Sequence, residues 1–183
     1  MSRNTAMSRL TQRFARDSRG VSAVEFALVL PLMMTLYLGS TEVSTGISAS
    51  RKVTLVSRAV ADLASQVSNI NNASMSNILN ASSAIVAPYA AANLKVTVTC
   101  VKIDANGNAT VAWSDTLNGT AHGTGSAVTL PAALNVASTS LIWSEVQYNY
   151  KPTIGYVISG TLTLKDQMYM RPRLSDTITR SVS

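Results

Sequence analysis

The stretch Arg19-Gly20-Val21-Ser22-Ala23-Val24-Glu25-Phe26 decides how this chain is organised. It joins a basic N-terminal segment to the chain's only long apolar run, which continues to Gly39. At 1.5 Å per residue, a helix over residues 21–39 is about 28 Å long, close to the roughly 30 Å hydrocarbon core of a bilayer. We therefore expect a transmembrane helix at residues 21–39.

The distribution of charge predicts the orientation of this helix. Five of the fifteen Lys and Arg residues lie in residues 1–20, and Arg16 and Arg19 border the apolar run directly. Positively charged flanks favour the cytoplasmic side, so residues 1–20 are expected to be a cytoplasmic leader and the remainder to be extracytoplasmic. Because the basic balance is concentrated there, the net charge of +6 does not indicate a nucleic-acid partner.

The apolar pattern continues beyond Gly39, which argues against a removable signal peptide cut near Gly39-Ser40-Thr41. Apolar side chains recur mostly at spacings of three and four, as in a helix, at Val43, Ile47, Val53, Val56, Val60, Leu63 and Val67. One long helix from about Val21 to about Val67 is therefore predicted, its first half in lipid and its second half in water. Pro31 predicts a kink within it.

Glu25 is a carboxylate inside the apolar run, five residues after Gly20. A charged group in a membrane helix is costly and usually has a functional partner. Cleavage after Gly20, where the lack of a Cβ gives a peptidase close access, would leave a new α-amine on Val21. That amine, or the amine of a neighbouring subunit, could pair with Glu25 and set the axial register between packed helices.

The segment Gly20-Val21-Ser22-Ala23-Val24-Glu25-Phe26-Ala27-Leu28-Val29-Leu30-Pro31 resembles the prepilin segment of the TadE-like family, minor pilins (pseudopilins) of the tight-adherence, or Flp-type, pilus system. The resemblance is weaker over residues 51–54 and 145–150. It implies cleavage after Gly20 by a membrane prepilin peptidase, with Phe26 completing the recognition motif and Glu25 and Val21 acting in assembly. The major pilins of that system are very small, so the large domain here favours a minor component.

The resemblance also implies a location and a set of partners. The protein is expected in the bacterial inner membrane, with its C-terminal domain periplasmic. The resemblance also allows its incorporation into an extracellular pilus. Its expected partners are the prepilin peptidase, other pilin and pseudopilin subunits, the inner-membrane pilus assembly machinery and the lipid bilayer. The alternative is an unprocessed single-pass membrane protein with a periplasmic binding or scaffold domain.

Residues 40–92 are expected to form an extracytoplasmic helical region, including a second helix after the transmembrane one. Asn72 or Ser74 is expected to cap this second helix, and Pro88 predicts its end near Tyr89. One face of the helix is predicted to be buried, comprising Met75, Ile78, Leu79, Ser82, Ile85, Val86 and Tyr89.

Residues 93–183 are expected to form a β-rich domain, because the apolar period changes to two beyond Ala92. Strands are predicted at Leu94–Asp104, Ala109–Ser114, Leu141–Tyr150 and Tyr156–Gln167, with Asn106-Gly107 as the turn between the first two. Val101 and Ile103 break the alternation, which predicts a bulge or a fully buried strand end. The fold class is α+β and pilin-like: a long helix, a second helix and an antiparallel sheet of about four strands.

The residue types offer no catalytic, cofactor-binding or metal-binding constellation, so an enzyme is not expected. The one cysteine, Cys100, is expected on the buried face of a strand, and the one histidine, His122, in an exposed loop over residues 116–126 without an acid at ligand spacing. Arg171-Pro172-Arg173 is expected to be a solvated tail or a surface contact. Four aromatic residues are expected to pack in the sheet: Trp113, Trp143, Tyr148 and Tyr150.

Overall fold

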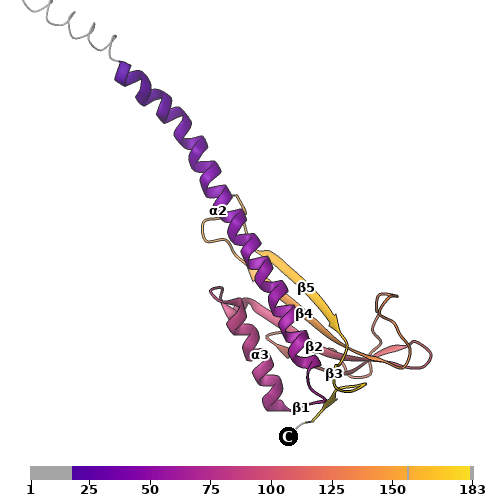
Figure 1. Cartoon of the computed structure of the whole chain (residues 1–183). Helices are drawn as coiled ribbons and strands as arrows, with labels where there is room; N and C mark the ends of the chain where they lie inside the picture. The colour runs from indigo at the N-terminus through magenta and orange to yellow at the C-terminus, as the bar shows by residue number, and fades with distance from the viewer. Residues whose placement is uncertain (1–17, 156, 182–183) are drawn as a thin grey trace, which may run out of the picture.

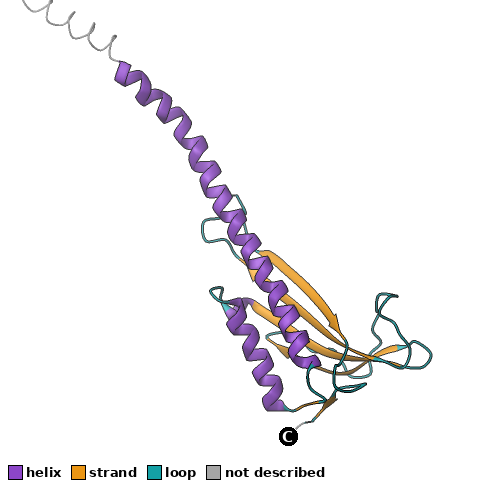
Figure 2. Cartoon of the chain, viewed as in Figure 1, coloured by secondary structure: helices purple, strands orange, loops and turns teal. Residues whose placement is uncertain are grey.

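A single long helix, α2 (Ser18–Ser65), dominates the computed structural model, which describes residues 18–155 and 157–181. The helix is continuous over 48 residues, including Pro31, and extends far beyond the rest of the molecule (Figure 1; Figure 2). This confirms the predicted long helix, which ends two residues earlier than expected. Most of the expected basic leader, residues 1–17, lies outside the described residues.

No other described part of the chain surrounds the first part of α2. Every residue from Gly20 to Tyr37 is exposed, and apolar side chains occupy all sides of the helix. A helix that is apolar all round belongs in a protein core or in a membrane, and here there is no core beside it. It is the one helix in the described part of the chain that is long and apolar enough to cross a membrane.

The second part of α2 packs on a sheet, although not through all the residues that the spacing predicts. Val53, Val56 and Val60 are buried as expected, whereas Val43 and Ile47 are 47% and 50% exposed. The buried stripe instead continues through smaller or polar residues, namely Glu42, Gly46 and Ala49. Small side chains let the helix approach the sheet closely, so the larger apolar side chains one position further on point outward.

The second helix, α3 (Asn72–Val86), packs beside α2. Its N-cap is Asn71, whose side chain accepts a hydrogen bond of 2.8 Å from the amide of Ser74, so the predicted caps Asn72 and Ser74 were wrong. The helix ends at Val86, three residues earlier than expected. Its predicted buried face is largely confirmed, with Met75, Ile78, Leu79, Ser82 and Val86 buried.

Four antiparallel strands form the sheet, in the order β3-β2-β4-β5. They are β2 (Leu94–Ile103), β3 (Ala109–Leu117), β4 (Ser140–Tyr150) and β5 (Leu162–Met170), and the short 3-10 turn η1 (Ala91–Asn93) precedes them. The antiparallel sheet confirms the α+β class. The last strand begins six residues later than predicted, because residues 151–155 and 157–161 form a loop beside α2.

Both helices cover the same face of the sheet, and a second, smaller core lies on the other face. The pairing of β2 with β3 shifts between Cys100 and Val101, which confirms the predicted bulge. Val101 and Ile103 are also buried, because loop residues Val128, Leu130 and Leu134 cover them. The apolar side chains that interrupt the alternation therefore serve this second core.

The C-terminal segment folds back onto the domain, which the sequence did not predict. Its strand β6 (Thr179–Arg180) pairs in parallel with β1 (Asn69–Ile70). Arg173 pairs with Asp62 of α2, and its amide donates to the carbonyl of Ser65 at 2.9 Å. Arg173 is therefore a surface contact, the second of the two expected alternatives, and its partners precede it by more than a hundred residues.

Candidate functional site

The four residues of the predicted processing site lie on the protruding part of α2. Val21 and Phe26 are 60% and 61% exposed, and a Cβ on Gly20 would meet no other atom within 4 Å. Val21 and Glu25 are four residues apart in a helix, so they share one side of it, one turn apart. A new amine on Val21, if the chain were cut after Gly20, would therefore lie one turn from Glu25 on an exposed part of the helix.

A second carboxylate, Glu42, joins α2 to the loop between β4 and β5, and the sequence reasoning missed it. Glu42 is only 3% exposed, and its Oε2 accepts hydrogen bonds from the amides of Val157 at 2.8 Å and Ile158 at 3.0 Å. A buried carboxylate requires such donors, because desolvation without them is costly. The sequence feature that could have indicated this contact is the position of Glu42, a single acid three residues after the end of the apolar run at Gly39.

Further contacts tie the same level of α2 to the domain. The hydroxyl of Tyr150 donates to Oγ1 of Thr45 at 2.9 Å, and the hydroxyl of Tyr89 donates to the carbonyl of Thr45 at 3.1 Å. Gly46 faces the ring of Tyr150, where a Cβ would be in ordinary van der Waals contact. Burial raises the pKa of Tyr89, with the neighbouring tyrosines contributing. The helix α2 and the sheet are therefore connected by packed and hydrogen-bonded side chains at this level.

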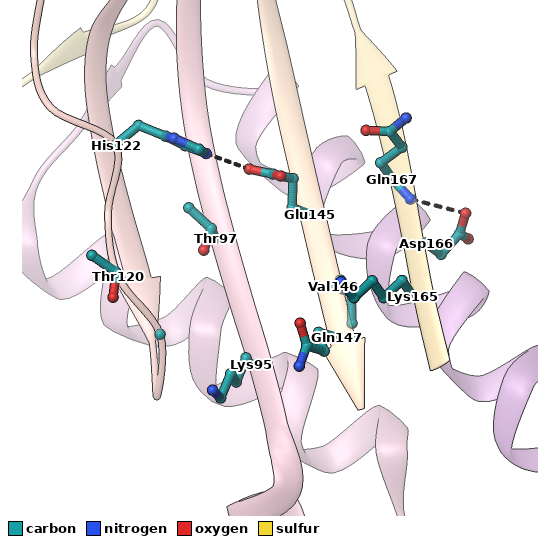
Figure 3. Close-up of a pocket in the computed structure, with 11 residues that line it drawn as sticks. Lys95, Thr97, Thr120, His122, Glu145, Val146, Gln147, Lys165, Asp166 and Gln167 are labelled. Carbon is teal, nitrogen blue, oxygen red and sulfur yellow. Dashed lines mark hydrogen bonds and ion pairs between the residues drawn. The ribbon is translucent and has the colours of Figure 1, made fainter. Parts of the chain in front are cut away.

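A groove of about 580 Å³ crosses the face of the sheet opposite the helices (Figure 3). Its floor includes a row across three strands, in which Gln147 of β4 pairs with Lys95 of β2 and Lys165 of β5. The loop carrying Thr120 and His122 forms one wall (Figure 3). The lining is polar and carries charges of both signs.

His122 is not the isolated, solvent-exposed residue that the sequence predicted. Its Nε2 lies 2.5 Å from Oε2 of Glu145, and its ring stacks on Trp143 with centroids 4.9 Å apart (Figure 3 shows the bond to Glu145). Its backbone amide donates to Oγ of Ser114 at 3.1 Å. The acid escaped notice because it lies on β4, 23 residues further along the chain.

Charged and polar side chains line much of this groove, an arrangement that can bind a polar ligand. The ring of His122 bonds Glu145, and its backbone amide donates to the hydroxyl of Ser114, which also hydrogen-bonds the hydroxyl of Thr99. Within residues 18–155 and 157–181, no group of three or more His, Cys, Asp or Glu side chains could hold a metal ion. Cys100 is fully buried in the main core, as predicted, and burial raises the pKa of its thiol.

Comparison with known proteins bears on α2. The model of the TadE-like protein family matches residues 20–62, which confirms the resemblance seen in the sequence. The match begins at Gly20 and covers most of α2. Neither curated proteins nor solved structures gave a match. The family similarity therefore concerns the helix, and the sheet with its groove lies outside it.

Proposed function

From this family match we propose that the chain is a minor pilin (pseudopilin) of a tight-adherence pilus. The match and the apolar helix fit a membrane protein associated with that pilus system. In the proposal, a prepilin peptidase cuts after Gly20, residues 21–39 span the inner membrane, and the domain lies in the periplasm. The observation that carries it is the form of α2, which is bare and apolar over residues 20–37 and then continues without a break into a folded domain.

Such a helix supports assembly by side-by-side packing. The mature N-terminal amine on Val21 would meet Glu25 of its own chain or of a neighbour, since two matched charges in lipid are far less costly than one alone. Further along α2, a shallow apolar groove includes Leu36, Val43 and Ile47. Their side chains are 65%, 47% and 50% exposed, so they are accessible to the helix of another subunit.

The proposed cleavage is tested by expressing the chain with its cognate prepilin peptidase and measuring the intact mass and the N-terminal sequence. A product that begins at Val21 supports the proposal. The matched controls are a peptidase with its catalytic aspartates replaced and the variant Gly20→Ile, both of which should leave the leader attached. A product that begins near residue 40 would identify a signal peptide and exclude the proposal.

A leader that stays intact beside an active peptidase would favour the alternative, an unprocessed single-pass membrane protein with a periplasmic scaffold domain. The groove on the face of the sheet opposite the helices is the feature that supports this alternative. Its polar floor between Lys95 and Lys165 is large enough for a ligand or a partner segment.

A further inference from the structure

We propose that the loop between β4 and β5 docks on the bilayer, with Ile154 and Val157 inserted at the boundary between headgroups and acyl chains. This loop, residues 151–155 and 157–161, is called the docking loop below. The inference rests on the proposed function, in which residues 21–39 span the membrane. It adds a second membrane contact, made by the folded domain itself.

The docking loop lies at the level where α2 would leave the hydrocarbon. A Cβ on Gly39, the last residue of the apolar run, would lie 3.1 Å from Cγ2 of Val157. Val157 also lines the shallow apolar groove together with Leu36, one turn nearer the N-terminus. In Figure 1 the loop lies beside α2 at the end of the domain that faces the protruding helix.

Exposed apolar side chains gather at this end of the domain. Outside α2, the described part of the chain has five exposed large apolar residues: Val136, Ile154, Val157, Leu162 and Leu174. Three of the five belong to the docking loop or to the first residue of β5. Ile154 and Val157 are 54% and 53% exposed, and burying them in an apolar medium is favourable because it removes their apolar surface from water.

The charge of the loop suits a membrane surface with anionic lipids. Lys151 is exposed at its start, and the sequence has no acid from Lys151 to Lys165. A basic residue near such a surface is attracted to the anionic headgroups. An apolar tip with a cation beside it is the usual composition of an interfacial anchor.

The loop is also held in its docking position before it meets lipid. Glu42 fixes the backbone at Val157 and Ile158, and Pro152 is buried. Gly155 and Gly160 have φ of 69° and 88°, a region that suits glycine, and so allow the loop to turn. A preformed loop loses little conformational entropy on binding, so most of the gain from apolar burial is retained.

The test measures the depth of the docking loop in vesicles of equal parts phosphatidylethanolamine and phosphatidylglycerol, with the full-length chain reconstituted. An environment-sensitive fluorophore is attached to Thr153→Cys, which leaves Ile154 and Val157 in place, and is quenched by nitroxide-bearing lipids. Met33→Cys reports the hydrocarbon, and Ala137→Cys reports the far end of the domain. Cys100 is fully buried, so the parent chain treated with the same reagent serves as the blank.

We expect quenching at position 153 to lie between the values at 33 and 137. Adding Ile154→Ser and Val157→Ser should lower it at least twofold, whereas Leu174→Ser, at another exposed apolar residue, should not. Quenching at 153 no greater than at 137, while 33 is quenched, overturns the docking loop and leaves membrane insertion intact. A blue-shifted but unquenched probe at 153 means that protein covers the loop and also overturns it. An unquenched probe at 33 refutes the membrane insertion and this inference together.

Discussion

The carboxylate of Glu42 lies 2.8 Å from the backbone nitrogen of Val157, 115 residues later in the chain. The same oxygen accepts from Ile158, and the carboxylate is almost completely buried. Hydrogen bonds to a charged acceptor are stronger in such surroundings than in water. These two hydrogen bonds connect the buried side of α2 directly to the loop between β4 and β5.

Replacing Glu42 should weaken this junction. Glu42→Ala removes the acceptor of two amides and should lower the free energy of unfolding by about 1–3 kcal/mol. Glu42→Gln should cost less, because an amide oxygen still accepts. The measurement is denaturant unfolding in detergent, followed by the fluorescence of Trp113 and Trp143. Glu25→Gln, on the protruding part of α2, is the matched control and should leave the midpoint unchanged. Equal midpoints for all three variants and the parent would contradict the role of Glu42.

Replacing Glu25 should impair assembly into pili and leave the stability of the fold unchanged. Glu25→Gln is expected to be cut after Gly20 like the parent and yet to fail to enter pili, because the amine on Val21 loses its charged partner in lipid. Breaking a buried ion pair costs about 3–5 kcal/mol, which corresponds to a loss of more than about a hundredfold. The readout is the amount of processed protein in sheared pili relative to the membrane fraction, with Met34→Leu as the control. Normal amounts of Glu25→Gln in pili would remove the pairing role.

The sequence predicted those parts of the fold that depend on local periodicity. Spacings of three and four located α2 and α3, and alternation located most of the four strands. The same apolar pattern misled where side-chain size decided the packing. Val43 and Ile47 belong to the apolar spacing of α2, but Gly46 and Ala49 allow the closer approach to the sheet and therefore form the contact.

The features that were missed depend on contacts between residues far apart in the chain. The apolar residues before Leu162 resemble the start of a strand, yet Val157 and Ile158 use their amides to bind Glu42 instead of a strand. The pairing of His122 with Glu145 likewise depends on the register of the sheet and on where its loop folds. Spacing along the sequence carries no information about either contact, whereas the resemblance to the TadE-like family rests on a local segment and is confirmed by the family match.

Cys100 should give the stability of the domain a measurable alkaline dependence. Its buried thiol has a raised pKa, so above pH 9 the unfolded chain ionises while the folded chain still holds the proton. The contribution is complete below the ordinary pKa of the thiol and is lost as the pH rises toward the folded value. Denaturant midpoints between pH 7 and about pH 10 should therefore fall less for Cys100→Ala than for the parent. The quantity compared is the slope of the denaturant midpoint against pH. The cavity left by Cys100→Ala lowers stability equally at every pH and does not alter this slope. Equal slopes for the variant and the parent would contradict the prediction.

Arg180 should be the residue that holds the C-terminal segment in place. Its Nε and Nη2 donate to the two carboxylate oxygens of Asp115 at 2.8 and 3.2 Å, and Nη2 also donates to Oδ1 of Asn72 at 2.7 Å. Lysine cannot reproduce this fork, so Arg180→Lys should lower the free energy of unfolding by about 1–2 kcal/mol.

The matched control is Arg173→Lys in the same segment, since Arg173 forms a more exposed pair with Asp62. That substitution should change the free energy of unfolding by less than about 0.5 kcal/mol, as is usual for surface pairs. A double-mutant cycle of Arg180→Lys with Asp115→Asn should give a coupling energy of about 1 kcal/mol, because the side chains are only 17% and 27% exposed. A coupling energy near zero would show that the segment is held by other contacts, foremost the 2.7 Å bond from the indole of Trp113 to the carbonyl of Ile178.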